Sequence, residues 1–242
     1  MPEVIARHNS GLEILPKDEF NGLFERLVLV RHGKTESNIQ ARLQGSIDNN
    51  LSETGRQKMA EIAKEMVDRF PNISAIVSSN MLRSLETAAI FSDAFKLKSK
   101  PIYIVKGLDE YHFGDWEGKL DDDLKKDSAS GYVAWQKKPL TAATAGEPFF
   151  QFLNRINNSH YTLAINEELP QQEKSIMLIT HGTVSRAIRF LYLSAPGTKG
   201  SIVDYDILKS KEKNFFFNFD GQIILPPHAP YFFDKEGSFQ KL

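Results

Sequence analysis

The chain has no cysteine among its 242 residues. Disulfides, thiolate nucleophiles and cysteine-ligated metal sites are therefore excluded. It also has almost no excess charge, because 30 Lys and Arg residues stand against 31 Asp and Glu residues. Nucleic acids and anionic membranes favour a strongly positive surface, so we expect neither as a partner.

Long apolar runs are missing as well. None approaches the ~18 residues of a bilayer-spanning helix, and residues 1–20 show no basic segment followed by an apolar stretch. We therefore expect no membrane association and a cytoplasmic location. The length suits one large domain with a well-buried core, which we expect to cover residues 1–242.

Short apolar runs alternate with helical patterns along most of the chain. Strands are predicted at residues 27–30, 73–77, 101–105 and 175–180. Apolar residues recur at helical spacing over residues 59–70, 82–95 and 184–193. Ser78-Ser79-Asn80 is typical of a cap for the second helix. This alternation predicts an α/β fold with three layers, α/β/α, and a mostly parallel sheet.

Two segments depart from the alternation. Charge clusters, a small-residue loop and a helix with His160 occupy residues 119–160, where we expect a cap insertion of helices and loops over the sheet edge. It would be either a solvated face or a surface that reads the substrate. Residues 200–242 are predicted as a strand-rich extension with a hairpin over 215–225. A possible homodimer through the sheet edge is left open, because no residue indicates it.

Charged side chains and histidines follow the predicted strands. Arg31 and His32 come directly after the first strand, and Arg83, Glu110 and His181 lie just beyond later ones. Active sites of parallel sheets lie at the carboxyl ends of the strands. Two arginines, two histidines and the amino ends of helices favour a dianionic tetrahedral group such as phosphate.

These residue types suit phosphoryl transfer. A neutral imidazole can attack phosphorus, and the charges of Arg31 and Arg83 oppose protonation of His32. His181 would hydrogen-bond the phosphoryl oxygens or, if protonated, neutralise their charge. Glu110 would protonate the leaving alkoxide and then activate water. The nearby carboxyl groups that compete for this role are Asp109, Asp115 and Glu117.

Taken together, the motifs resemble the histidine phosphatase superfamily, the phosphoglycerate-mutase-like proteins. The resemblance is to the branch with cofactor-dependent mutases, fructose-2,6-bisphosphatase domains and broad-specificity phosphatases. It spans roughly residues 27 to 195 in the family's order, and the joint occurrence makes it specific. The matching residues are Arg31-His32-Gly33, Thr35, Asn38, Gln44-Gly45, Leu51-Ser52, Gly55, Ser78-Ser79, Arg83, Thr87-Ala88, Leu108, Glu110, Gly114, Trp116-Glu117-Gly118 and Thr180-His181-Gly182.

The resemblance implies a role for each site residue. His32 would be the phosphorylated nucleophile and Glu110 the proton donor. Arg31, Arg83 and His181 would form the phosphate pocket. Supporting contacts would come from Asn38, Gln44, Gly45 and Gly182. The resemblance implies no metal and no cofactor, and a phosphorylated small molecule as substrate.

Departures from the family pattern bear on the subfamily. Lys34 stands where the family usually has Glu or Gln, which suggests a more positive pocket rim and highly anionic substrates. Residues 110–114 half resemble the mutases, whereas Trp116-Glu117-Gly118 resembles the phosphatases, and residues 119–160 contain no Arg-Arg pair. We therefore expect a metal-independent phosphatase that hydrolyses phosphomonoesters through a phosphohistidine on His32. The alternatives are a phosphoglycerate mutase and a catalytically weak module that binds phosphorylated ligands; the physiological substrate is open.

Overall fold

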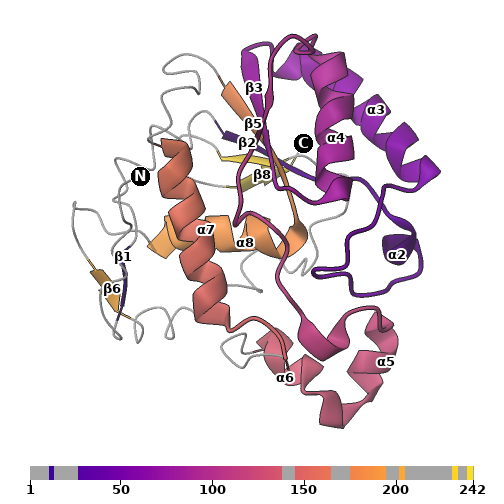
Figure 1. Ribbon diagram of the computed structural model, residues 1–242, viewed down its shortest axis with the longest axis vertical. Coiled ribbons are helices and arrows are strands. Elements are labelled where there is room, and N and C mark those ends of the chain that lie inside the picture. The colour runs from indigo at the N-terminus through magenta and orange to yellow at the C-terminus, as the bar shows by residue number, and fades with distance from the viewer. Residues whose placement is uncertain are drawn as a thin grey trace.

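The chain folds around a six-stranded sheet, as the computed structural model shows (Figure 1). The structure describes residues 11–13, 27–137, 145–164, 175–194, 202–204, 231–233 and 239–241. In spatial order the strands are β4 (Ile102–Ile104), β3 (Ile73–Ser78), β5 (Ser175–Thr180), β2 (Leu27–Arg31), β7 (Tyr231–Phe233) and β8 (Phe239–Lys241). The first four are parallel, and β7 and β8 are antiparallel to their neighbours. The predicted mostly parallel sheet is confirmed.

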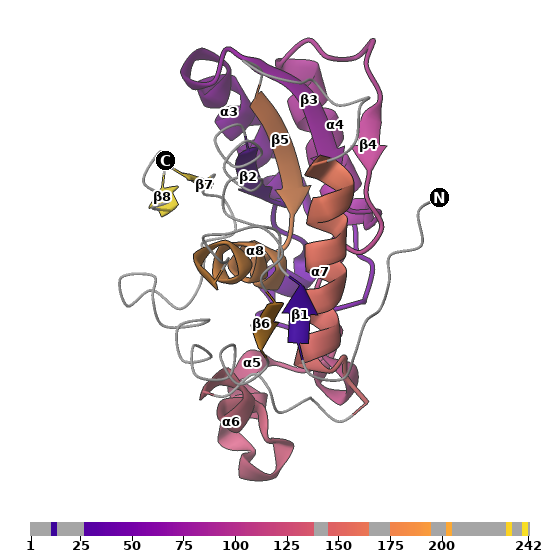
Figure 2. The same ribbon diagram turned by 90° about the vertical axis from the view of Figure 1, so that its left-hand side faces the viewer.

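Alternate residues of the central strands face two separate cores. In β2, Leu27 and Leu29 pack with α7 (Phe149–Ala164) and α8 (Gly182–Ser194). Val28 and Val30 pack with α3 (Glu53–Arg69) and α4 (Leu82–Ala94) on the opposite face. A strand that is apolar throughout is what a sheet covered on both faces requires. Figure 1 shows the three layers that the sequence predicted, with α7 and α8 on one side of the strands and α3 and α4 on the other, and Figure 2 looks onto the α7 and α8 side of the sheet.

The start of α4 differs from the prediction. The residue before the helix is Met81, which makes no side-chain capping bond, so the predicted Ser78-Ser79-Asn80 cap is wrong. The Ser79 hydroxyl is instead within hydrogen-bond distance of His181, and Oδ1 of Asp48 accepts the bond from the Leu82 N–H at 2.8 Å. A distant loop therefore caps this helix.

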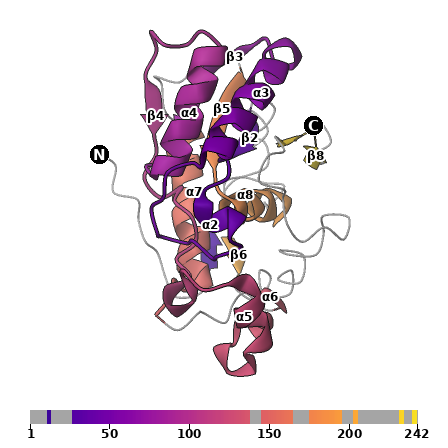
Figure 3. The same cartoon turned by 90° about the vertical axis from the view of Figure 1, so that its right-hand side faces the viewer.

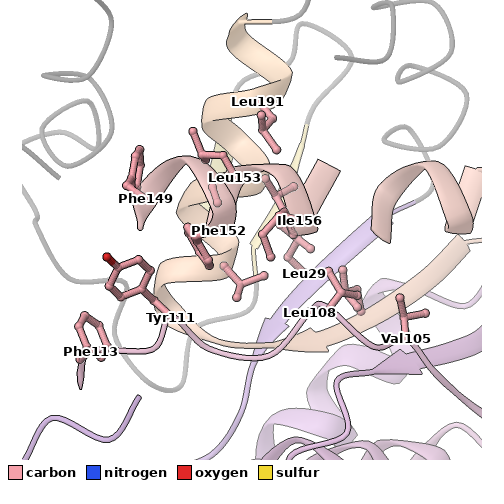
Figure 4. Close-up of a cluster of buried hydrophobic side chains, with 14 of the residues drawn as sticks. Leu29, Val105, Leu108, Tyr111, Phe113, Phe149, Phe152, Leu153, Ile156 and Leu191 are labelled. Atoms are coloured by element: carbon pink, nitrogen blue, oxygen red, sulfur yellow. The ribbon is translucent and has the colours of Figure 1, made fainter. Parts of the chain in front are cut away.

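Short helices lie past the carboxyl ends of the parallel strands (Figure 3). They are η1 (Gly114–Trp116), α5 (Asp121–Lys126), η2 (Ser128–Ser130) and α6 (Tyr132–Lys137). Their aromatic side chains Trp116, Tyr132 and Trp135 belong to the same buried cluster as α7 and the sheet. Figure 4 shows the part of this cluster around Tyr111 and Phe152. The ring centroids of Tyr111 and Phe152 are 5.1 Å apart, and those of Trp116 and Trp135 are 5.7 Å apart.

Several short elements carried too little pattern to be predicted. They are α2 (Glu36–Ile39), β1 (Gly11–Glu13), which pairs antiparallel with β6 (Ile202–Asp204), and the individual strands β7 and β8 of the predicted strand-rich extension, with β8 at the sheet edge. The hairpin predicted for 215–225 lies outside the described residues. None of the described helices is long and apolar enough to cross a membrane.

Candidate active site

Two histidines meet at the carboxyl ends of the adjacent strands β2 and β5. Arg31 pairs with Thr180 in the ladder, and the His32 N–H continues it by donating to the Thr180 carbonyl at 2.9 Å. His181 follows Thr180, so the two imidazole rings lie side by side with centroids 5.2 Å apart. Both rings are buried. Parallel pairing in this register is what brings residues so distant in the sequence together.

The surroundings of His32 determine which ring nitrogen can react. Its Nδ1 lies 2.7 Å from the carbonyl oxygen of Gly33. A carbonyl only accepts, so Nδ1 carries the hydrogen and the lone pair of the neutral ring is on Nε2. The Gly33 N–H donates to Thr87 Oγ1 at 3.1 Å, and that hydroxyl donates to the Arg83 carbonyl at 2.7 Å. The first two turns of α4 thereby anchor the histidine loop.

His181 is held as a neutral ring. Its Nε2 lies 2.8 Å from Oγ of Ser79 and 3.3 Å from Oγ of Ser84. Burial, followed by the positive charge of Arg83, lowers the pKa of His181 well below its ordinary value of 6.5. With hydroxyl donors at Nε2, the favoured tautomer has its hydrogen on Nδ1, which is buried without a hydrogen-bond partner within the described residues. Of the two roles expected for His181, hydrogen bonding fits this geometry.

Arg83 is a fully buried guanidinium. Its Nη1 donates to the Ile47 carbonyl and its Nη2 to the Gly45 carbonyl, each at 2.8 Å. Its Nε is buried and has no partner in the described part of the chain. Burial lowers the pKa of Arg83, and the nearby carboxylate of Glu110 opposes that shift. An anion placed here would satisfy a buried donor whose isolation otherwise costs about 1–3 kcal/mol.

Arg31 lies against the first turn of α8. A Cβ added at Gly182 would come within 3.3 Å of Arg31 Cζ, so only glycine leaves the guanidinium full room. The positive charge of Arg31 also contributes to the lowered pKa of His181, after burial, Arg83 and His32. The amino end of α8 adds partial positive charge at the same place.

Glu110 reaches the histidine segment from the other side. The Thr183 N–H lies 3.2 Å from each of its carboxylate oxygens, and the Tyr111 N–H donates to Oε1 at 2.9 Å. Two of the three competing acids are engaged elsewhere or face solvent. Glu117 accepts from Ser46 and from the Phe113 N–H, Asp115 is exposed, and the half-buried carboxyl of Asp109 has its pKa raised by burial.

Asn38 and Gln44 meet at a buried threonine. Thr35 Oγ1 donates to Gln44 Oε1 at 2.8 Å, and the Thr35 N–H donates to Asn38 Oδ1 at 3.2 Å. Thr35 therefore fixes both amides relative to the histidine loop, two residues after Gly33. Gly45 has φ +55°, and its carbonyl is the acceptor for Arg83. Asn38, Gln44 and Gly45 therefore contribute to the site by fixing the segment after His32 and by binding Arg83.

Sequence reasoning missed several contributors. The roles of Ser79 and Ser84 as partners of His181 had no local signal, because the partners are 102 and 97 residues away. Arg155 in α7 binds the loop that carries Glu110, and it lies in a helix without a motif. Thr87 is among the residues that carry the family resemblance, but its contact with the Gly33 N–H was not predicted, although it follows Arg83 by one helical turn. Among the described residues no three His, Asp or Glu side chains are grouped to hold a metal ion.

Comparison with known proteins places this geometry in a family. Residues 27–205 match the histidine phosphatase superfamily (branch 1). The chain is 30% identical over 180 residues to a glucosyl-3-phosphoglycerate phosphatase of Mycolicibacterium vanbaalenii, covering 71% of this chain and 75% of that protein. It is 26% identical over 185 residues to a metal-independent phosphoserine phosphatase of Arabidopsis thaliana, with 75% and 74% covered.

A solved structure shows the same fold. The mycobacterial glucosyl-3-phosphoglycerate phosphatase in complex with VO3 superposes with a TM-score of 0.68 at 22% identity, covering 90% of this chain and 97% of that one. Because the family match spans most of the chain and includes the residues that meet at the strand ends, this protein belongs to the histidine phosphatase superfamily, branch 1.

Proposed function

We propose that the protein is a metal-independent phosphatase that hydrolyses phosphomonoesters through a phosphohistidine on His32. The observation that carries the proposal is the hydrogen bond from Nδ1 of His32 to the Gly33 carbonyl beside a cluster of buried donors. It places the reactive lone pair on Nε2, next to Arg83 and His181, whose unpartnered N–H groups fit phosphoryl oxygens.

In the first step, Nε2 of His32 attacks phosphorus and the bond from phosphorus to the ester oxygen breaks. The departing alkoxide takes a proton from the carboxyl of Glu110. Arg31 and Arg83 balance the negative charge on the equatorial oxygens, and Nδ1–H of His181 donates to one of them. The neutral state of His181 suits this donor role.

In the second step, water attacks the phosphohistidine. Glu110, now a carboxylate, takes a proton from that water, and the bond from phosphorus to Nε2 breaks. Inorganic phosphate leaves and His32 returns to its starting state. One carboxyl group therefore serves as acid and then as base, and the amide N–H groups of Tyr111 and Thr183 fix its orientation.

Hydrolysis is favoured over mutase transfer by the relatives, two of which are named as a glucosyl-3-phosphoglycerate phosphatase and a phosphoserine phosphatase. It is favoured over a binding module because every role in the two steps has a resident side chain. We place the reaction in the cytoplasm, with phosphorylated small molecules as substrates. Neither step requires the homodimer that the sequence left open.

The test is hydrolysis of p-nitrophenyl phosphate between pH 5 and 8 in excess EDTA, with rapid quenching to trap the phosphoenzyme. We expect the wild type to be active, to show an alkali-stable, acid-labile phosphoryl group, and to lose both in His32→Ala. Glu110→Gln should lose about 10²-fold in kcat, because the attack of water on the phosphohistidine still needs the base. Glu65→Gln and Arg69→Ala, at exposed positions of α3, should retain full activity.

Three outcomes would contradict the proposal. Equal hydrolysis by the wild type and His32→Ala would remove His32 as the nucleophile. Transfer of the trapped phosphoryl group to added 3-phosphoglycerate in preference to water would make the protein a mutase, and binding of phosphate without any turnover would make it a binding module.

A further inference from the structure

The guanidinium of Arg155 uses all five of its N–H donors on one side of the active site. Its Nε and Nη2 bind the two carboxylate oxygens of Glu147 at 2.6 and 2.8 Å. Its Nη1 donates to the carbonyls of Gly107 and Asp109 at 2.6 and 2.7 Å, and Nη2 donates to the Glu110 carbonyl at 3.0 Å. Three carbonyls within four residues are thus fixed by one side chain.

The helix that carries Arg155, α7, contacts the loop of residues 106–111 at further points. Ser159 lies one turn after Arg155, and its hydroxyl hydrogen is shared between the Lys106 carbonyl at 3.1 Å and the Arg155 carbonyl at 2.8 Å. A Cβ at Gly107 would lie 2.5 Å from Ser159 Oγ, so the loop and α7 are in the closest contact that glycine permits. Phe152 and Ile156 pack in one buried cluster with Leu108 and Tyr111, on either side of Glu110 (Figure 4).

Glu147 also binds the two residues that follow Glu110, Tyr111 and His112. Its N–H donates to the His112 carbonyl at 2.8 Å, and its carbonyl accepts the hydroxyl hydrogen of Tyr111. The Arg155–Glu147 pair therefore binds the backbone on both sides of Glu110. The carboxylate of Glu110 accepts from the Thr183 N–H. Both members are largely buried, with side-chain exposures of 25% and 14%.

We propose that Arg155 is the positioning residue for proton transfer by Glu110, acting with Glu147 from the helix behind the catalytic loop. This inference rests on the proposed function. A carboxyl that must deliver a proton to the leaving oxygen has to be held within a few tenths of an ångström, and a rigid, five-donor guanidinium holds the backbone more firmly than the point charge of a lysine.

The experiment compares two phosphomonoesters that differ in their need for an acid. p-Nitrophenolate leaves readily without a proton, whereas the alkoxide from benzyl phosphate needs one. We expect Arg155→Lys and Arg155→Met to lower kcat/KM for benzyl phosphate by about 30-fold or more and for p-nitrophenyl phosphate by less than about 3-fold. In a Glu110→Gln background the added loss on benzyl phosphate should fall below about 3-fold.

A matched control separates positioning from general damage. Arg56 is also half-buried, pairs with Glu86 at 2.8 Å and binds the Leu51 carbonyl at 2.8 Å, but it supports a different loop. Arg56→Met should change both substrates by the same factor. Thermal unfolding of each variant reports any loss of fold, and Arg155→Lys keeps the test informative if Arg155→Met does not fold.

Equal losses on both esters in Arg155→Lys, or a full additional loss in the Glu110→Gln background, would overturn the inference. Those results leave the phosphohistidine on His32 intact, because the wild-type phosphoenzyme is measured in the same preparation. Hydrolysis that survives His32→Ala would instead overturn the proposed function, so the two failures are distinguishable.

Discussion

Nε2 of His181 lies 2.8 Å from Oγ of Ser79, a residue at the end of the neighbouring strand. The Ser79 hydroxyl therefore contacts the imidazole and does not cap α4. In the tautomer that we assign, the hydroxyl donates to Nε2 and the ring hydrogen is on Nδ1, which makes His181 a neutral donor for a phosphoryl oxygen. A loop residue, Asp48, then binds the exposed amide of Leu82 at the start of α4.

We predict that Ser79→Ala lowers kcat/KM for p-nitrophenyl phosphate by about tenfold, which corresponds to ~1.4 kcal/mol. Without this donor, the tautomer of His181 that donates through Nδ1 loses its main support. Steady-state kinetics with the purified variant measures the effect. Ser92→Ala, at a buried serine within α4, should leave the rate unchanged. Unchanged kinetics in Ser79→Ala would contradict the tautomer assignment.

The buried state of His181 predicts a dependence of stability on pH. Burial lowers the pKa of His181 below 6.5, and in the unfolded chain this pKa returns to about 6.5. As pH falls below 6.5, the unfolded chain binds a proton that the folded protein does not. The free energy of unfolding should therefore fall by up to about 1.4 kcal/mol per pH unit until the folded pKa is reached.

Urea unfolding at a series of pH values from 8 to 5 measures this slope in the wild type and in His181→Gln. The variant should lack this component of the slope, whereas His112→Gln, at a largely exposed histidine, should keep it. A wild-type slope that persists undiminished in His181→Gln would show that other groups cause it.

Gly45→Ala should be more destabilising than the same substitution at a glycine whose added Cβ would meet no other atom. Gly45 has φ +55°, and a Cβ there would overlap the carboxylate of Glu117, which is bound to Ser46 and to the Phe113 N–H. We expect a loss of at least ~2 kcal/mol in the free energy of unfolding, together with lower activity through Arg83.

Gly131 is the matched position for that experiment. Its φ is +71°, and an added Cβ would meet nothing within 4 Å. Gly131→Ala should cost about 1 kcal/mol from the left-handed backbone alone, with activity retained. Equal losses at the two positions, measured by urea unfolding, would mean that the Glu117 contact does not constrain Gly45.

Lys34 should favour substrates with a second negative group. It follows Gly33 and is half-buried beside the histidine loop. We expect Lys34→Gln to lower kcat/KM for 3-phosphoglycerate by about 5-fold while changing that for glycerol 3-phosphate by less than about 2-fold. The two esters differ in the carboxylate, so an unchanged ratio would count against this role for Lys34.

The central fold could be predicted because its signals are local. The all-apolar run of β2 indicates a strand buried on both faces, and the helical spacing in α3 indicates one packed face. Three-residue strands such as β1 and β7 carry too few side chains for any period to be detected. The cap of α4 was predicted wrongly because a serine next to a helix has the same pattern whether it binds the helix or a distant histidine.

The sequence by itself determined the chemistry that is present: an Arg-His pair after a buried strand, a second histidine after another, and an arginine at the start of a helix. Only the tertiary structure decided how these groups act. The parallel register of β2 and β5 brings the two rings to 5.2 Å, and burial keeps His181 neutral. Arg155 grips the Glu110 loop from α7, a contact across 45 residues that depends on how that helix packs against the sheet.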